Sequence, residues 1–156
     1  YWVVRERFIA DDLLVVASDV MFTRSFDLGL ILNYFHEKCG EVVTRLQVAD
    51  EMVSKTGILE LDAQERIVGF LEHPSPGATA SRWSCPPFYI YRRGTIAERL
   101  PRFMAEKAPQ GRQALDSPGL LVRWLFPKEP VYAFPVEGRY DTGNLEGLKR
   151  ANALLA

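Results

Sequence analysis

The sequence predicts an α/β domain with a mixed, mostly parallel sheet. Two observations lead to this fold class. An apolar run, a segment of helical spacing and a second apolar run follow one another over residues 13–48, and the period then changes to two over residues 57–69. The first arrangement is typical of strands joined by a crossover helix, and the second of an antiparallel hairpin. Both kinds of strand pairing are therefore expected in one sheet.

The first half of the chain is expected to form a strand–helix–strand unit with a right-handed crossover. Residues 13–17 are a short run of Leu, Val and Ala, which fits a strand covered on both faces. Ser25 is a candidate N-cap, the apolar residues after it have helical spacing, and Gly40 ends that helix. Residues 41–48 then form the second strand.

The later elements follow from spacing and turn residues, beginning with a hairpin that turns at residues 62–65. They are a loop at 74–87, a strand at 88–91, a helix at 95–107 weakened by Pro101, a helix that starts at Ser117 and Pro118, a strand at 131–136, a turn at 138–143 and a final helix from Asn144. The final helix is expected to direct Leu145, Leu148, Ala151 and Leu155 inward.

Charge and composition exclude several classes of function. The chain has 19 Lys and Arg against 20 Asp and Glu, so it offers no basic field for nucleic acid. No apolar run reaches the ~18 residues of a membrane span. Two cysteines and two histidines are too few for a disulfide framework or a structural zinc site. A cytoplasmic globular protein is the expected class, and the pattern leaves open whether it forms homo-oligomers.

Two aspartates stand where predicted strands give way to turns. Asp19 follows the strand at 13–17, at the carboxyl end where open α/β sheets bind their ligands. A turn or cap role explains Asp19 equally well, and for Asp141, which lies between glycines before the last helix, a cap is the favoured interpretation. As a pair they suggest a magnesium site, because Mg²⁺ is usually held by one or two carboxylates together with substrate phosphates.

The strand that ends at Glu72 provides a third candidate. Glu72 can accept hydrogen bonds from the hydroxyls of a polar ligand, although a solvated strand end fits as well. His73 follows, and a lone histidine is more often structural or exposed than catalytic. In the next loop, Trp83 is either a plug or the wall of a ligand site. Cys85 has no base near it in the sequence, so no nucleophile is expected there.

Four segments occur in an order that resembles a known family. They are LVVASDVMF at 14–22, GILELD at 57–62, FLEHP at 70–74 and GRYDTGN at 138–144. In this order and at these separations, the chain resembles the sugar-phosphate nucleotidylyltransferases, also called nucleotide-sugar pyrophosphorylases. The likeness spans nearly the whole chain. It implies a Rossmann-related, glycosyltransferase-A-like mixed sheet.

The resemblance also implies a reaction, the transfer of a nucleoside monophosphate from an NTP to a sugar 1-phosphate, which gives an NDP-sugar and pyrophosphate. By position, Asp19 and Asp141 would be the catalytic residues and would hold Mg²⁺. Glu72 would bind sugar hydroxyls, and Gly57 and His73 would border the sugar. The partners would be an NTP and a sugar 1-phosphate, and the sequence chooses neither the base nor the sugar.

The chain departs from the family pattern in three places. The glycine-rich loop and the lysine that grip the triphosphate are not found before Asp19. The lysine that usually follows the acid of the sugar motif is His73 here, and Pro86 and Pro87 replace a small residue and a glycine. Residues 1–156 are therefore expected to be the C-terminal portion of a nucleotidyltransferase catalytic domain, incomplete and inactive by itself.

Two alternatives belong to other functional classes. One is a non-catalytic relative that binds sugar phosphate or nucleotide sugar and serves as a regulatory or structural subunit. The other is a receiver-type signalling domain, suggested by an aspartate at the end of a Val-rich strand. The hairpin at 57–71 argues against the receiver domain, because such domains alternate strands and helices.

Overall fold

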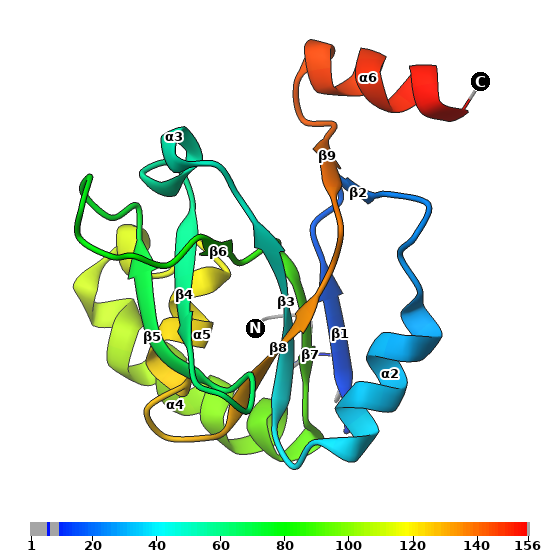
Figure 1. Cartoon of the computed structure of the whole chain (residues 1–156). Helices are drawn as coiled ribbons and strands as arrows, with labels where there is room; N and C mark the ends of the chain where they lie inside the picture. The colour runs from blue at the N-terminus through cyan, green and yellow to red at the C-terminus, as the bar shows by residue number, and fades with distance from the viewer. Residues whose placement is uncertain (1–5, 7–9, 156) are drawn as a thin grey trace.

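The computed structural model of the chain describes residue 6 and residues 10–155. Its centre is a seven-stranded sheet with the strand order β1-β7-β3-β6-β4-β5, and β8 pairs with β3 beside this path. A separate two-stranded ribbon pairs β2 with β9. Helix α2 lies on one face of the main sheet, and α4 and α5 lie on the other (Figure 1).

The strands are β1 Leu13–Val16, β2 Val20–Phe22, β3 Glu41–Gln47, β4 Gly57–Leu61, β5 Ile67–Glu72, β6 Trp83–Ser84, β7 Phe88–Tyr91, β8 Val131–Pro135 and β9 Arg139–Asp141. The α-helices are α2 Leu28–Glu37, α3 Asp50–Val53, α4 Leu100–Lys107, α5 Gly119–Leu125 and α6 Leu145–Leu155. A π-helical turn at Thr95–Arg99 and two 3₁₀ turns at Ala108–Gln110 and Arg112–Ala114 flank α4.

The main sheet is mostly antiparallel, which corrects the mostly parallel sheet expected from the sequence. In the part of the chain that the structure describes, β3 and β8 form the only parallel pair. Strand β7 lies between β1 and β3 and is antiparallel to both. The two strands of the strand–helix–strand unit therefore run in the same direction without touching. Spacing along the chain marks strands, but it does not show which strand will lie between two others.

Strand β7 is central because both of its faces are covered. Tyr89 and Tyr91 belong to the apolar cluster with α4 and α5, whereas Phe88 and Ile90 belong to the cluster with α2. All four side chains are buried. Burial of such a side chain contributes about 1.5–3 kcal/mol, so this short aromatic strand joins the two halves of the core.

Strand β1 lies at one end of the strand order, and only one of its faces is well covered. Leu13 and Val15 pack against the larger cluster, while Leu14 and Val16 are 40% and 44% exposed. The expectation of a strand covered on both faces was wrong. A run of Leu and Val is compatible with either situation, since each strand has an inward and an outward row.

The structure corrects three expectations about residues near helix N-termini. Asp27, not Ser25, caps α2, because its Oδ1 accepts a hydrogen bond from the Leu30 amide at 3.2 Å. Pro101 lies in the first turn of α4, directly after the π-helical turn, where its missing N–H is tolerated. Ser117 makes no side-chain cap on α5, and its hydroxyl donates to Glu72 instead.

Two short strands lie where a loop and a turn were expected. Strand β6 crosses the predicted loop and pairs antiparallel with β3 and β4. Strand β9 occupies the predicted turn at 138–143 and pairs with β2, placing Asp141 opposite Val20. Strands of two or three residues are too short to show an alternation of apolar and polar side chains, so they can be recognised only from their pairing with other strands.

Helix α6 extends from the ribbon and stands apart from the main sheet (Figure 1). Asn144 caps it, since its Oδ1 accepts from the Gly147 amide at 2.9 Å. Ala151 is buried as expected, but Leu145 and Leu148 are 69% and 44% exposed, so their predicted inward position was wrong. The side chain of Leu155 lies outside the described residues. No helix in the described ranges is long and apolar enough to cross a membrane.

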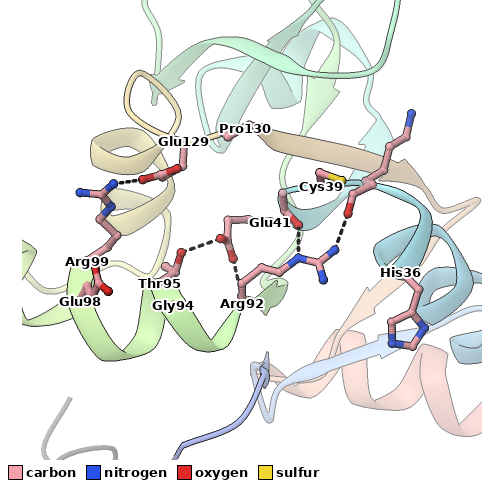
Figure 2. Close-up of a pocket in the computed structure, with 12 residues that line it drawn as sticks. His36, Cys39, Glu41, Arg92, Gly94, Thr95, Glu98, Arg99, Glu129 and Pro130 are labelled. Carbon is pink, nitrogen blue, oxygen red and sulfur yellow. Dashed lines mark hydrogen bonds and ion pairs between the residues drawn. The ribbon is translucent and has the colours of Figure 1, made fainter.

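A paired polar network closes the end of the sheet where β3 begins and β7 ends (Figure 2). The buried carboxylate of Glu41 accepts hydrogen bonds from the Arg92 amide and the Thr95 hydroxyl, both at 2.6 Å. The Arg92 guanidinium donates to the Gly40 carbonyl at 3.1 Å and to two carbonyls near the end of α2, and it lies 4.0 Å from the centre of the Phe35 ring. This network fixes α2 to the sheet.

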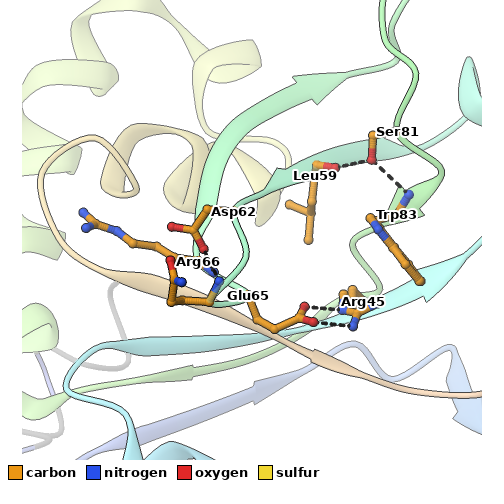
Figure 3. A network of polar contacts seen from close by, with 8 residues as sticks. Arg45, Leu59, Asp62, Glu65, Arg66, Ser81 and Trp83 are labelled. Carbon is orange, nitrogen blue, oxygen red and sulfur yellow. Dashed lines mark hydrogen bonds and ion pairs between the residues drawn. The ribbon is translucent and has the colours of Figure 1, made fainter.

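A second network holds the β4–β5 hairpin against β3 (Figure 3). Arg45 makes two contacts with the Glu65 carboxylate, at 2.9 and 3.0 Å, and its guanidinium lies 4.0 Å from the centre of the Trp83 ring. Trp83, in β6, packs against the larger cluster and against Arg45, which favours the plug interpretation over the wall of a ligand site.

Candidate functional site

The ribbon of β2 and β9 brings the two predicted metal-binding aspartates together. Asp19 lies in the turn between β1 and β2, and Asp141 is the last residue of β9. The Thr142 amide donates to the Asp19 carbonyl at 2.7 Å, which joins the two turns. A Cβ atom placed on Gly143 would lie 3.1 Å from both Asp19 Oδ2 and Asp141 Oδ1. The two carboxylates thus approach a single open point that any side chain at position 143 would fill.

This pair suits a divalent cation that is shared with a substrate. Both aspartates are exposed, and no cluster of three or more His, Cys, Asp or Glu occurs within the described residues. Mg²⁺ fits such a place, because it keeps several waters and is often held by one or two carboxylates plus substrate phosphates. The cap interpretation of Asp141 does not hold for α6, which is capped by Asn144. Among the described residues, Asp141 Oδ1 accepts a hydrogen bond only from the nearby Gly143 amide, at 2.9 Å.

Glu72 lies in a polar cavity of about 190 Å³ where β5 ends. Its Oε1 accepts from the Ser117 hydroxyl at 3.3 Å, whereas its buried Oε2 has no hydrogen-bond partner in the described part of the chain. Cβ atoms on Gly57 and Gly119 would lie 2.9 and 3.3 Å from that oxygen. A buried carboxylate oxygen without a donor is costly, so this geometry is suited to a ligand that donates hydrogen bonds, such as a hydroxyl group.

Three basic side chains line the same cavity. His73 and Lys55 are exposed, and the imidazole Nε2 of His73 lies 3.8 Å from Glu72 Oε1. Arg139 is half-buried and comes from β9, two residues before Asp141. The sequence analysis did not identify Arg139. Its spacing from Asp141 becomes a signal only when residues 139–141 are known to form a strand, because side chains two residues apart on a strand lie on the same face.

Cys85 and Tyr89 form a wall of the cavity and stay in their neutral forms. Burial is the main cause that raises the pKa of the Cys85 thiol and of the Tyr89 phenol, and the Glu72 charge raises both further. The positive charge of Arg139 opposes these shifts. A protonated thiol is a weak nucleophile, so Cys85 contributes shape and not covalent chemistry.

A larger cavity, of about 490 Å³, lies at the other end of β7 beside the Arg92 network (Figure 2). Several of its charged groups are paired within the protein. Glu41 is held by Arg92 and Thr95, and Arg99 pairs with Glu129. Size alone therefore does not select the functional site, and in the described part of the chain the smaller cavity contains a buried carboxylate oxygen, Glu72 Oε2, without a hydrogen-bond donor.

Comparison with known proteins identifies the family. A family model described as nucleotidyl transferase matches residues 2–156. The chain is similar to apo UDP-glucose pyrophosphorylase, with 19% identity and a TM-score of 0.80 over 97% of this chain and 57% of that one. It is also similar to a UTP-bound UGPase from Acinetobacter baumannii, with 19% identity and a TM-score of 0.74 over 95% of this chain and 52% of that one.

A third similar structure is a putative glucose-1-phosphate thymidylyltransferase from Bacillus anthracis in complex with a sucrose. It matches with 18% identity and a TM-score of 0.68 over 97% of this chain and 57% of that one. At these identities the solved structures show a shared fold, and the present chain spans little more than half of their length. The family model covers nearly every residue, including both aspartates and the cavity at Glu72. The chain therefore belongs to the nucleotidyl transferase family.

Proposed function

We propose that this chain forms the sugar-binding and metal-binding portion of a catalytic domain that makes an NDP-sugar. In the proposed reaction, a phosphate oxygen of a sugar 1-phosphate attacks the α-phosphorus of an NTP, and the bond from that phosphorus to the pyrophosphate oxygen breaks. The main support for this proposal is that the carboxylates of Asp19 and Asp141 approach one point. The same ribbon also provides Arg139, which lines the cavity that contains Glu72.

The known ligands of similar structures agree with these substrate classes. One is a UDP-glucose pyrophosphorylase complexed with UDP-glucose, and another is a UGPase bound to UTP. Residues 1–156 would form the C-terminal portion of the proposed domain. This is supported by the match to apo UDP-glucose pyrophosphorylase, which covers only 57% of the length of that protein.

Each site residue has a role that follows from its surroundings. Glu72 would accept a hydrogen bond from a sugar hydroxyl through its free Oε2, and Gly57 would let the sugar approach the strand. His73 would border the sugar from the solvent side. Asp19 and Asp141 would hold Mg²⁺, which when bound neutralises phosphate charge. Positioning and charge neutralisation are the main sources of catalysis in phosphoryl transfer.

A non-catalytic relative that binds a sugar phosphate is the second candidate. It is favoured by His73, whose side chain is 60% exposed and whose backbone has a left-handed φ of 47°. An imidazole does not carry a permanent positive charge, whereas the resemblance leads one to expect a lysine at this position.

The first experiment measures pyrophosphate release by the longest protein that contains this chain, with Mg²⁺ and a panel of NTPs and sugar 1-phosphates. At least one pair of substrates is expected to give release well above an enzyme-free blank. If no pair gives release while a sugar 1-phosphate still binds, the catalytic proposal is wrong and the non-catalytic relative replaces it.

The Asp141→Asn variant tests the metal site directly. We expect turnover to fall by roughly 100-fold or more, because a metal ion supplies several kcal/mol of charge stabilisation. The Mg²⁺ concentration for half-maximal rate should rise, and the melting temperature should change little because Asp141 is exposed. Glu37→Gln, which removes an exposed carboxylate at the end of α2, is the matched control. Equal Mg²⁺ dependence in both variants would remove Asp141 from the site.

A further inference from the structure

Arg139 is a half-buried arginine that lines the cavity at Glu72, and its guanidinium makes no hydrogen bond or ion pair with the described residues. We infer that Arg139 binds the phosphate group of the sugar phosphate and makes this site selective for phosphorylated sugars over free sugars. The inference rests on the proposed function and names the residue that recognises the charged part of its substrate.

The position of Arg139 lies between the two halves of the site. Its side chain lines the cavity that contains Glu72, and it lies on the same face of β9 as Asp141, two residues further along. The register of the ribbon places Arg139 opposite Phe22 and Asp141 opposite Val20. A ligand with its hydroxyls at Glu72 and its phosphate toward the aspartates would thus pass Arg139.

The charge of Arg139 also indicates a phosphate. A guanidinium is always charged, and partial burial without an anion is unfavourable. Glu72 does not neutralise it through any direct contact, although both charges act on Cys85 and Tyr89 in the same cavity. A phosphate group would supply two oxygens in the geometry that a guanidinium prefers, as a bidentate and charge-assisted pair.

The other cations of the cavity are less suited to this role. His73 is exposed and close to Glu72 Oε1, and an imidazole, unlike a guanidinium, does not carry a permanent positive charge. Lys55 is exposed at the cavity rim, where solvent screens its charge. Of these three side chains, only Arg139 on β9 combines a permanent positive charge with partial burial, and His73, which follows Glu72, has neither.

Binding measurements on this chain test the inference without requiring turnover. Glucose 1-phosphate, methyl α-glucoside and inorganic phosphate are titrated into the wild type, Arg139→Lys, Arg139→Gln and the control Arg102→Gln, whose arginine is exposed on α4. We expect glucose 1-phosphate to bind the wild type and the control equally. Arg139→Gln should weaken its binding by about tenfold or more, with Arg139→Lys between the two, because hydrogen bonds to charged groups are worth roughly 1.5–3 kcal/mol.

Binding of the uncharged methyl α-glucoside should be the same in all four proteins, which separates phosphate recognition from a general loss of structure. The inference is overturned if Arg139→Gln binds glucose 1-phosphate as the wild type does, or if the wild type binds neither glucose 1-phosphate nor inorganic phosphate. It is also overturned if Arg139→Gln weakens methyl α-glucoside to the same degree.

Kinetics on the longest protein separate this inference from the proposed function. Arg139→Gln should raise the KM for the sugar 1-phosphate about tenfold and leave the KM for the NTP within about twofold. An equal rise in both constants would assign Arg139 to the nucleotide and contradict the inference. If neither the wild type nor the variants release pyrophosphate, but binding of glucose 1-phosphate still depends on Arg139, the catalytic proposal is contradicted and the inference about Arg139 stands.

Discussion

The two ends of strand β7 differ in how their polar groups are satisfied. Beyond Tyr91, the buried Glu41 carboxylate accepts hydrogen bonds from the Arg92 amide and the Thr95 hydroxyl. The Arg92 guanidinium donates to the Gly40 carbonyl. Before Phe88, Glu72 has a buried oxygen without a donor and Arg139 has no anion, within the described residues. The polar groups at the first end therefore stabilise the fold, whereas those at the second end are available to bind a ligand.

This difference shows how a functional site is recognised among cavities. The cavity beside Arg92 is the larger of the two, at about 490 Å³ against 190 Å³. Several of its charged groups are held by neighbouring side chains and backbone carbonyls, so a ligand that bound them would have to displace contacts that stabilise the fold. At Glu72 a ligand could bind without displacing such contacts, since Glu72 Oε2 and the Arg139 guanidinium have no partners among the described residues.

Substitution of the two glutamates should give the largest contrast. Glu41→Ala is expected to lower the free energy of unfolding by about 3 kcal/mol, because it leaves buried donors without an acceptor. Glu72→Ala should change it by about 1 kcal/mol or less and abolish detectable binding of glucose 1-phosphate. Urea denaturation and titration of glucose 1-phosphate measure both effects. A larger stability loss for Glu72→Ala than for Glu41→Ala would reverse the assignment of the two ends.

Two glycines provide a smaller contrast of the same kind. Gly57→Ala would place its Cβ 2.9 Å from Glu72 Oε2 and from the Phe70 ring, so we expect a loss of about 1–2 kcal/mol in stability and weaker sugar binding. Gly94→Ala at the other end has no atom within 4 Å of the new Cβ and a helical backbone. It should be neutral or stabilise by about 0.4–1 kcal/mol. Equal effects of the two changes in urea denaturation would contradict this picture.

The smallest expected effect is a pH dependence at the paired end. Burial is the main cause that raises the pKa of Glu41 above its ordinary value of 4.5, although hydrogen bonds from Thr95 and Arg92 oppose the shift. The folded protein then retains a proton that the unfolded chain releases, so the stability from this group is complete below about pH 4.5 and declines as pH rises through the folded pKa. The neutral Glu41→Gln variant should lack this decline. Denaturation midpoints from pH 4 upward, compared between the two proteins, test the sign of the slope, and parallel curves would show that Glu41 does not titrate differently on folding.

Periodicity identified most elements of the fold but not their neighbours. The helix before Gly40, the β4–β5 hairpin and the strand at Phe88–Tyr91 occur where apolar spacing predicts them. The insertion of β7 between β1 and β3 made the sheet mostly antiparallel, and no local pattern indicates it. Strands β6 and β9, of two and three residues, are also defined by their partners.

The candidate site shows the same division. Asp19, Gly57, Glu72, His73 and Asp141 were predicted from their places at the ends of strands and from the order of four motifs. Their assignment as site residues remains a prediction that the proposed variants test. Arg139 was not predicted, because an arginine in a glycine-flanked turn has no distinctive spacing until β9 pairs with β2.

The sequence by itself determined which residue types are available and where strands and helices form, because side-chain period and turn residues act within a few positions. The tertiary structure alone decided which of these residues meet. It brought Asp19 and Asp141, 122 positions apart by residue number, to one point above Gly143, and placed Arg139 in the cavity of Glu72. Contacts across such separations depend on strand order and on the packing of both faces of the sheet, which are properties of the whole core and not of any single segment.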